Sequence, residues 1–136
     1  PVKLSVGSGD AKARNLASLD AQVGSGDLEA HDIKGKVRGT VGSGDLKLED
    51  TGEVDIDSIG SGDFGAKRAA SVRIGTIGSG DAKIEGTQGN VQVGTIGSGD
   101  LDVSDVHGDL TVRSIGSGDI DHRGVTGKVD IPRDKN

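Results

Sequence analysis

The sequence predicts an all-β fold: a single-stranded β-solenoid (β-helix), expected to be right-handed, of about seven coils of 17–19 residues. The first observation is a tetrapeptide, Gly-Ser-Gly-Asp, that begins at Gly7, Gly24, Gly42, Gly60, Gly78, Gly97 and Gly116. The second is the spacing of these motifs, which is 17, 18, 18, 18, 19 and 19 residues. That period is too short for a pair of packed helices. The third is the alternation of Val and Ile with polar residues between motifs, which indicates strands.

The composition of the 136-residue chain agrees with a narrow core. Phe64 is the only aromatic residue, and there is no Trp, Tyr, Met or Cys. The core must therefore consist mainly of Val, Ile, Leu and Ala. Glycine content and a net charge of -6 would suggest disorder if the period were absent. We expect residues 1–136 to form one domain, since this length suits a single core.

Alignment of the repeats on their Asp predicts six inward columns per coil, because residues two apart on a strand face the same side. The first strand supplies Ala11, Leu28, Leu46, Phe64, Ala82, Leu101 and Ile120, and then Ala13, Ala30, Leu48, Ala66, Ile84, Val103 and His122. A corner supplies Leu16, Ile33, Thr51, Ala69, Thr87, Val106 and Val125. The second strand supplies Leu19, Val37, Val54, Val72, Val91, Leu110 and Val129, and then Ala21, Gly39, Ile56, Ile74, Val93, Val112 and Ile131. The residue before each motif closes the coil.

One-residue differences in coil length are assigned to the corners, where an extra residue does not reverse the faces of a strand. On the outward side of the second strand, Asp20, Arg38, Asp55 and Arg73 alternate in sign. We expect these side chains to pair along the stack, which would stabilise the register slightly.

The two ends of the chain are predicted to differ. Residues 132–136, with a Pro and three charges, are typical of a C-terminal cap. Residues 1–6 are typical of the closing strand of an earlier coil, so we expect N-terminal coils to have been removed, and a signal peptide could have been removed with them. An N-terminal edge left open would offer a surface for end-to-end self-association.

The motif Asp is the main candidate for chemistry, at Asp10, Asp27, Asp45, Asp63, Asp81, Asp100 and Asp119. These carboxylates recur at about the 4.8 Å strand spacing, so their repulsion must be compensated. In the favoured interpretation each Asp accepts hydrogen bonds from the N–H groups of its Gly-Ser-Gly turn, whose glycines supply positive φ. The alternative is a row of Ca²⁺ sites.

Calcium-binding nonapeptide repeats have the pattern Gly-Gly-x-Gly-x-Asp and fill a coil in pairs. In this chain the Asp follows the second Gly directly, and the opposite corner has no matching motif. We therefore favour no metal site and no cofactor, with Ca²⁺ bound by the Asp column as the alternative.

An enzyme is not expected. The serines of the motif, Ser8, Ser25, Ser43, Ser61, Ser79, Ser98 and Ser117, are predicted to form a hydroxyl ladder between coils, because no His or Lys recurs to activate them. His31, His107 and His122 occupy three different positions of the repeat and make no stacked ligand set. No insertion exceeds one residue, so no loop can build a pocket.

The charge distribution limits the partners. The 16 Lys and Arg residues are scattered among 22 acidic ones, which argues against nucleic acid. No segment approaches the roughly 20 apolar residues of a membrane-spanning helix. A column of hydroxyls, Ser5, Gln22, Thr40, Ser58, Thr76, Thr95 and Ser114, has the character of an ice-binding face. It lacks a paired Thr column, so ordinary strand formation is the preferred explanation.

The form Val/Ile-Gly-Ser-Gly-Asp followed by alternating apolar residues, as in residues 96–103, resembles the bacterial head GIN domain family of autotransporter adhesins. It also resembles related β-strand-repeat domains of unknown function. The resemblance implies an exported, periplasmic or cell-surface β-helical module with no catalytic residues to carry over. We expect a non-enzymatic structural, adhesive or binding role toward a surface, protein or carbohydrate partner. The alternatives are a Ca²⁺-dependent solenoid and a self-assembling filament subunit.

Overall fold

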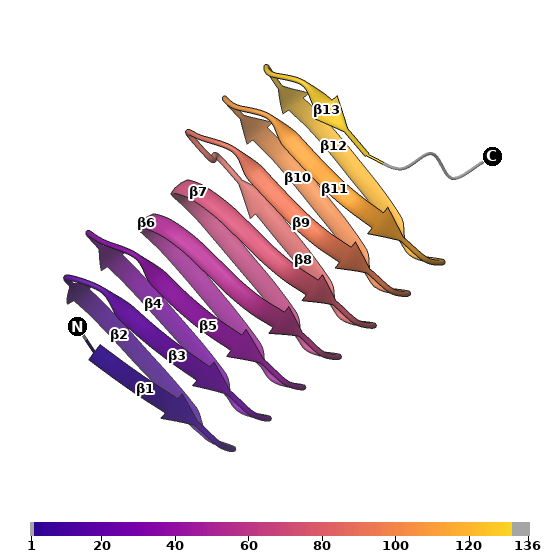
Figure 1. Ribbon diagram of the computed structural model, residues 1–136. Coiled ribbons are helices and arrows are strands. Elements are labelled where there is room, and N and C mark those ends of the chain that lie inside the picture. The colour runs from indigo at the N-terminus through magenta and orange to yellow at the C-terminus, as the bar shows by residue number, and fades with distance from the viewer. Residues whose placement is uncertain (1, 132–136) are drawn as a thin grey trace.

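The computed structural model describes residues 2–131, which form 13 β-strands and no helix (Figure 1). The strands are β1 Val2–Val6, β2 Asp10–Leu16, β3 Leu19–Val23, β4 Asp27–Ile33, β5 Val37–Val41, β6 Asp45–Ile59, β7 Asp63–Ile77, β8 Asp81–Glu85, β9 Val91–Ile96, β10 Asp100–Val106, β11 Leu110–Ile115, β12 Asp119–Val125 and β13 Val129–Asp130. The predicted C-terminal cap at 132–136 lies outside the described residues.

Figure 1 shows the coils stacked in chain order, each contributing one strand to each of two walls. Strands β2, β4, β8, β10 and β12 form the first wall, together with residues 45–51 of β6 and 63–69 of β7. Strands β1, β3, β5, β9, β11 and β13 form the second wall, with residues 54–59 and 72–77. All of these pairs are parallel. The predicted β-solenoid of about seven turns is confirmed.

The register places equivalent residues of successive coils side by side. Asp45 pairs with Asp63, Leu46 with Phe64 and Val54 with Val72. The predicted columns therefore stack as expected, and every buried hydrophobic residue belongs to one of them.

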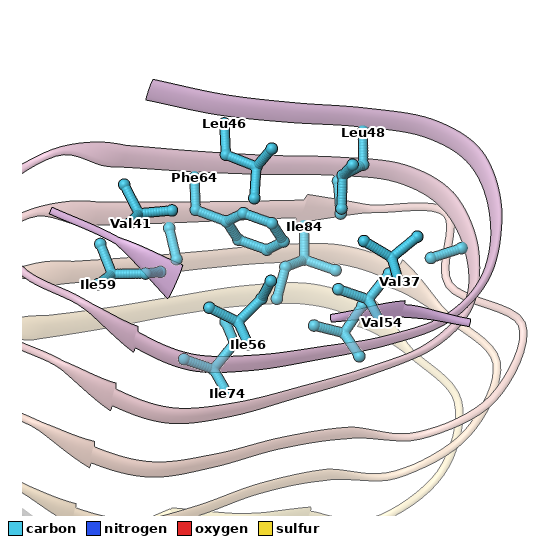
Figure 2. Close-up of a cluster of buried hydrophobic side chains, with 14 of the residues drawn as sticks. Val37, Val41, Leu46, Leu48, Val54, Ile56, Ile59, Phe64, Ile74 and Ile84 are labelled. Atoms are coloured by element: carbon cyan, nitrogen blue, oxygen red, sulfur yellow. The ribbon is translucent and has the colours of Figure 1, made fainter. Parts of the chain in front are cut away.

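The core fills the narrow space between the two walls. Figure 2 shows Phe64, Leu46 and Ile56 directed toward one another across this space. Phe64 is 2% exposed and pairs with Ala82 in the next coil, whose small side chain leaves room for the ring. Large and small residues thus alternate along one column, as close packing requires.

The last coil departs from the prediction. His122 and Val129, placed in inward columns by the sequence, are both exposed, Val129 by 38%. No described coil packs beyond this one, so its inward positions are not covered.

The motif glycines are required for close approach, and the expectation that they supply positive φ was wrong. The only described glycines with positive φ are Gly86 and Gly124, outside the motif. At Gly62 a Cβ would lie well under 3.0 Å from the carbonyl oxygen of Gly44, a separation that real Cβ atoms essentially never show. The second glycine of the motif makes this approach in each later coil. Its hydrogen side chain lets the backbones of adjacent turns stack.

Positive φ occurs instead at the corner, five residues after each motif Asp. The residues are Asn15, Asp32, Asp50, Arg68, Gly86, Asp105 and Gly124, with φ between 54° and 70°. Asn, Asp and Gly tolerate this left-handed conformation better than other residues. The sequence contained this signal, because Arg68 is the one member of the column that is none of the three.

Candidate functional site

The motif Asp column does not cap its own turn. Its side chains are exposed, except for that of Asp45, which is half-exposed. The N–H groups of the turn donate to carbonyls of the preceding coil, for example Ser61 N to Gly42 O at 3.0 Å and Asp63 N to Gly44 O at 3.2 Å. In the described chain, one carboxylate of the column accepts a hydrogen bond, from Asp119 N to Asp100 Oδ1 at 3.3 Å. The predicted Asp capping of the Gly-Ser-Gly turn was therefore wrong.

The same geometry bears on the calcium alternative. Within residues 2–131, no three His, Asp or Glu side chains converge closely enough to hold a metal ion. Calcium takes six to eight oxygen ligands, whereas the column presents one carboxylate per coil. Ca²⁺ binding remains a hypothesis for solution experiments.

The predicted serine hydroxyl ladder was also wrong. Among the motif serines of the described chain, only Ser25 uses its hydroxyl, which donates to Gly7 O at 3.0 Å. Successive turns are joined by backbone bonds instead, since Ser43 N donates to Gly24 O at 2.8 Å and the later serines repeat the pattern.

The three histidines lie apart. His31, on β4, has its Nδ1 3.0 Å from Glu49 Oε1. His107 follows β10 at a corner, and His122 is exposed on β12. Arg68 extends the group around His31, because it also lies 3.8 Å from Glu49 and pairs with Asp50. This network occupies the corner edge of the first wall.

The sign-alternating column of the second wall does not pair as predicted. Asp20, Arg38, Asp55 and Arg73 form no ion pair with one another in the described structure. Asp55 pairs instead with Lys36, at 3.8 Å. The column therefore leaves charged groups available on the outer surface of the wall.

A stacked β-bulge on the same wall was not foreseen. The register shifts between Gly39 and Val41 of β5 and the facing residues of β6, because Asp57 is an extra residue in the second strand. The next coils keep the extra residue at Gly75, Gly94 and Arg113, which the flanking ladder pairs bypass. The assignment of all length differences to corners was thus wrong for this one. A bulge tolerates the insertion because both flanking residues keep their faces.

The sequence did carry a sign of the bulge. From the first inward residue of the second strand to the next motif there are five residues at Val37–Gly42 and six at Val54–Gly60. Coil length alone concealed this difference, since both coils have 18 residues.

The bulge forms the floor of an open groove of about 800 Å³ across β6, β7, β9 and β11. Gly75 and Gly94 make the centre of the floor, with Asp57 toward one end and Arg113 toward the other. Side chains on these two glycines are excluded, because a Cβ on either would collide with the carbonyl oxygen of the coil before it. The groove is therefore kept open by the packing of the backbone.

Polar side chains line both sides of the groove. Asp55, Arg73, Gln92 and Thr111 form one side, and Thr95 and Ser114 the other, joined by a hydroxyl hydrogen bond of 3.2 Å. Within residues 2–131, the side chains of Asp57, Arg73, Gln92 and Arg113 have no ion-pair or hydrogen-bond partner. These groups are free to bind a ligand or water.

Residues 39–132, which include the whole groove, match the family described as "Putative auto-transporter adhesin, head GIN domain". The chain belongs to this family. The head GIN resemblance of the repeats is thereby confirmed over most of the chain. No curated protein and no solved structure matches the sequence. In the described part of this head GIN domain, no helix is long and apolar enough to cross a membrane.

Proposed function

We propose that this head GIN domain is a non-enzymatic module of the bacterial cell surface, in which a rigid solenoid presents a polar face for adhesion. The observation that carries the proposal is the open groove on the second wall, where charged and amide side chains without partners in the described structure project from a regular sheet. Membership of a family described as adhesins supports the same role.

The solenoid suits a role in contact because its shape is fixed by short-range interactions. Each coil bonds through its backbone to the next, as in the bond from Gly78 N to Ile59 O at 2.7 Å. Repeat arrays of this kind form extended surfaces without large loops. Non-obligate interfaces of proteins are also no more apolar than the rest of the surface, so a polar face is compatible with binding.

Surface location and adhesion can be tested together. An epitope-tagged full-length protein is expressed in its native bacterium, and its location is followed by fractionation and by protease accessibility of intact cells. The purified chain, fluorescently labelled, is then titrated onto intact bacterial and host cells. We expect an envelope location and saturable binding that excess unlabelled chain displaces. A cytosolic protein whose purified form binds no cell surface would contradict the proposal.

A further inference from the structure

We propose that the groove between Asp57 and Arg113 binds an uncharged glycan chain. This inference rests on the proposed adhesive function and names the ligand class of the same face. The argument uses the shape of the groove, the balance of its charges and the surfaces that the molecule does not offer.

The shape suits a short linear segment. Asp57 and Arg113 are three coils apart, which corresponds to about 14 Å at the strand spacing. The volume of about 800 Å³ falls in the range of ligand-binding clefts. Because Gly75 and Gly94 exclude side chains from the floor, a ligand can approach the backbone there, and the groove remains open along its length.

The charges of the groove balance. Two carboxylates, Asp55 and Asp57, face two guanidinium groups, Arg73 and Arg113, so the site has no net charge. Carboxylates accept hydrogen bonds, guanidinium groups donate them, and the carboxamide of Gln92 does both. A ligand that matches this set carries many neutral groups that both donate and accept. Sugar hydroxyls have that chemistry.

Other ligand classes fit less well. An anionic polymer requires a basic surface, whereas this groove is neutral and the chain has a net charge of -6. An extended peptide binds by adding a strand at a sheet edge, but the groove lies in the middle of a wall, across β7 and β9. The side chains that line it offer no apolar pocket for an anchoring residue. A neutral glycan remains the class that the groove favours.

The test is an NMR titration of the ¹⁵N-labelled chain with soluble neutral oligosaccharides of glucose, mannose, galactose and N-acetylglucosamine at millimolar concentrations. Heparin serves as the anionic comparison. We expect amide shifts confined to residues 55–57, 73–75, 92–95 and 111–114 with at least one neutral glycan. Arg113→Ala and Asp57→Ala should each weaken that binding about tenfold, since each removes a hydrogen-bonding charged group.

Lys47→Ala is the matched control, because Lys47 is an exposed charged residue of the first wall, and its affinity should be unchanged. All three variants replace exposed side chains, and the same spectra report whether they fold. Shifts outside the groove, shifts with heparin alone, or no shift with any neutral glycan would overturn the inference. If labelled chain still binds cells in that case, the adhesive function stands and only the ligand class fails. If no cell surface is bound, the proposed function itself fails.

Discussion

Arg68 of β7 lies over Asp50 of β6 in the adjacent coil and holds it with two hydrogen bonds, Nε to Oδ1 at 2.6 Å and Nη2 to Oδ2 at 3.1 Å. Both residues have left-handed backbones, with φ of 55° and 56°. Arg68 is therefore the unusual residue of a corner column otherwise made of Asn, Asp and Gly. The bidentate ion pair gives a physical reason for its presence, since the column would otherwise place Asp32 and Asp50 in succession without a counter-charge.

This pair should make stability depend on pH. The hydrogen bond from Arg68 lowers the pKa of Asp50 below its ordinary value of 3.8, with charge attraction adding to it and burial opposing it. The folded state then binds fewer protons than the unfolded state, so the contribution is complete above about pH 4 and is lost as pH falls through the folded pKa. Arg68→Gln should lower Tm slightly at pH 7, and the gap from wild type should close by pH 2. The measurement is Tm by circular dichroism across this range. Arg14→Gln, at an exposed position, is the control, and a gap independent of pH would refute the assignment.

The left-handed corner should discriminate between two glycines. Gly86 has φ of +70°, and a Cβ there would have ordinary space, so Gly86→Ala should destabilise by about 1 kcal/mol through backbone strain alone. Gly65 lies in β7 without positive φ and with space for a Cβ. Gly65→Ala should therefore be neutral or stabilising by up to about 1 kcal/mol. Urea unfolding of both variants measures the difference, and equal effects would contradict the role given to the corner.

The motif glycine should be far less tolerant. Gly62→Ala would drive a Cβ into the backbone of Gly44, and neither backbone can move without breaking the coil-to-coil ladder. We expect a loss of about 3 kcal/mol or more, or failure to fold. The neighbouring Ser61→Ala removes a hydroxyl that has no partner in the described structure and should change stability by less than about 0.5 kcal/mol. If the serine variant were the worse of the two, the hydroxyl would matter more than the close approach.

A buried hydroxyl offers a stabilising substitution. Thr87 is 0% exposed, and its Oγ1 has no hydrogen-bond partner among the described residues. Thr87→Val keeps the shape and removes the unsatisfied group, so we expect stabilisation by about 1 kcal/mol in chemical denaturation. Thr51 occupies the same column in another coil, but its Oγ1 donates to Gly52 O at 3.3 Å. Thr51→Val should give no gain, and a gain at Thr51 with none at Thr87 would argue against this explanation.

Metal removal should leave the fold unchanged. The motif carboxylates are largely exposed, and the described residues bring no three acidic or histidine groups together. We expect identical circular dichroism spectra and Tm with excess EDTA and with millimolar Ca²⁺. A chain that folds only with calcium, or gains many degrees from it, would establish the Asp column as a metal site.

The stacking of the core followed from the sequence. The repeat of Gly-Ser-Gly-Asp and the alternation after it define which residues are equivalent, and a parallel ladder then places Leu46 beside Phe64 and Val54 beside Val72. Period-2 alternation leaves only one face for the apolar residues. For this reason the inward columns could be assigned residue by residue without coordinates.

Only the tertiary structure decided how the backbone and the polar groups use that frame. The extra residue of coil three could lie in a corner or inside a strand, and the pairing of β5 with β6 places it at Asp57, within the wall. The reason for the glycines likewise depends on the backbone of the neighbouring coil, since Gly62 is constrained by Gly44 and not by its own turn. Ion pairs such as Arg68 with Asp50 depend on side-chain reach between coils. Hydrophobic alternation fixes the face of each residue, whereas these features depend on distances between turns that no single repeat contains.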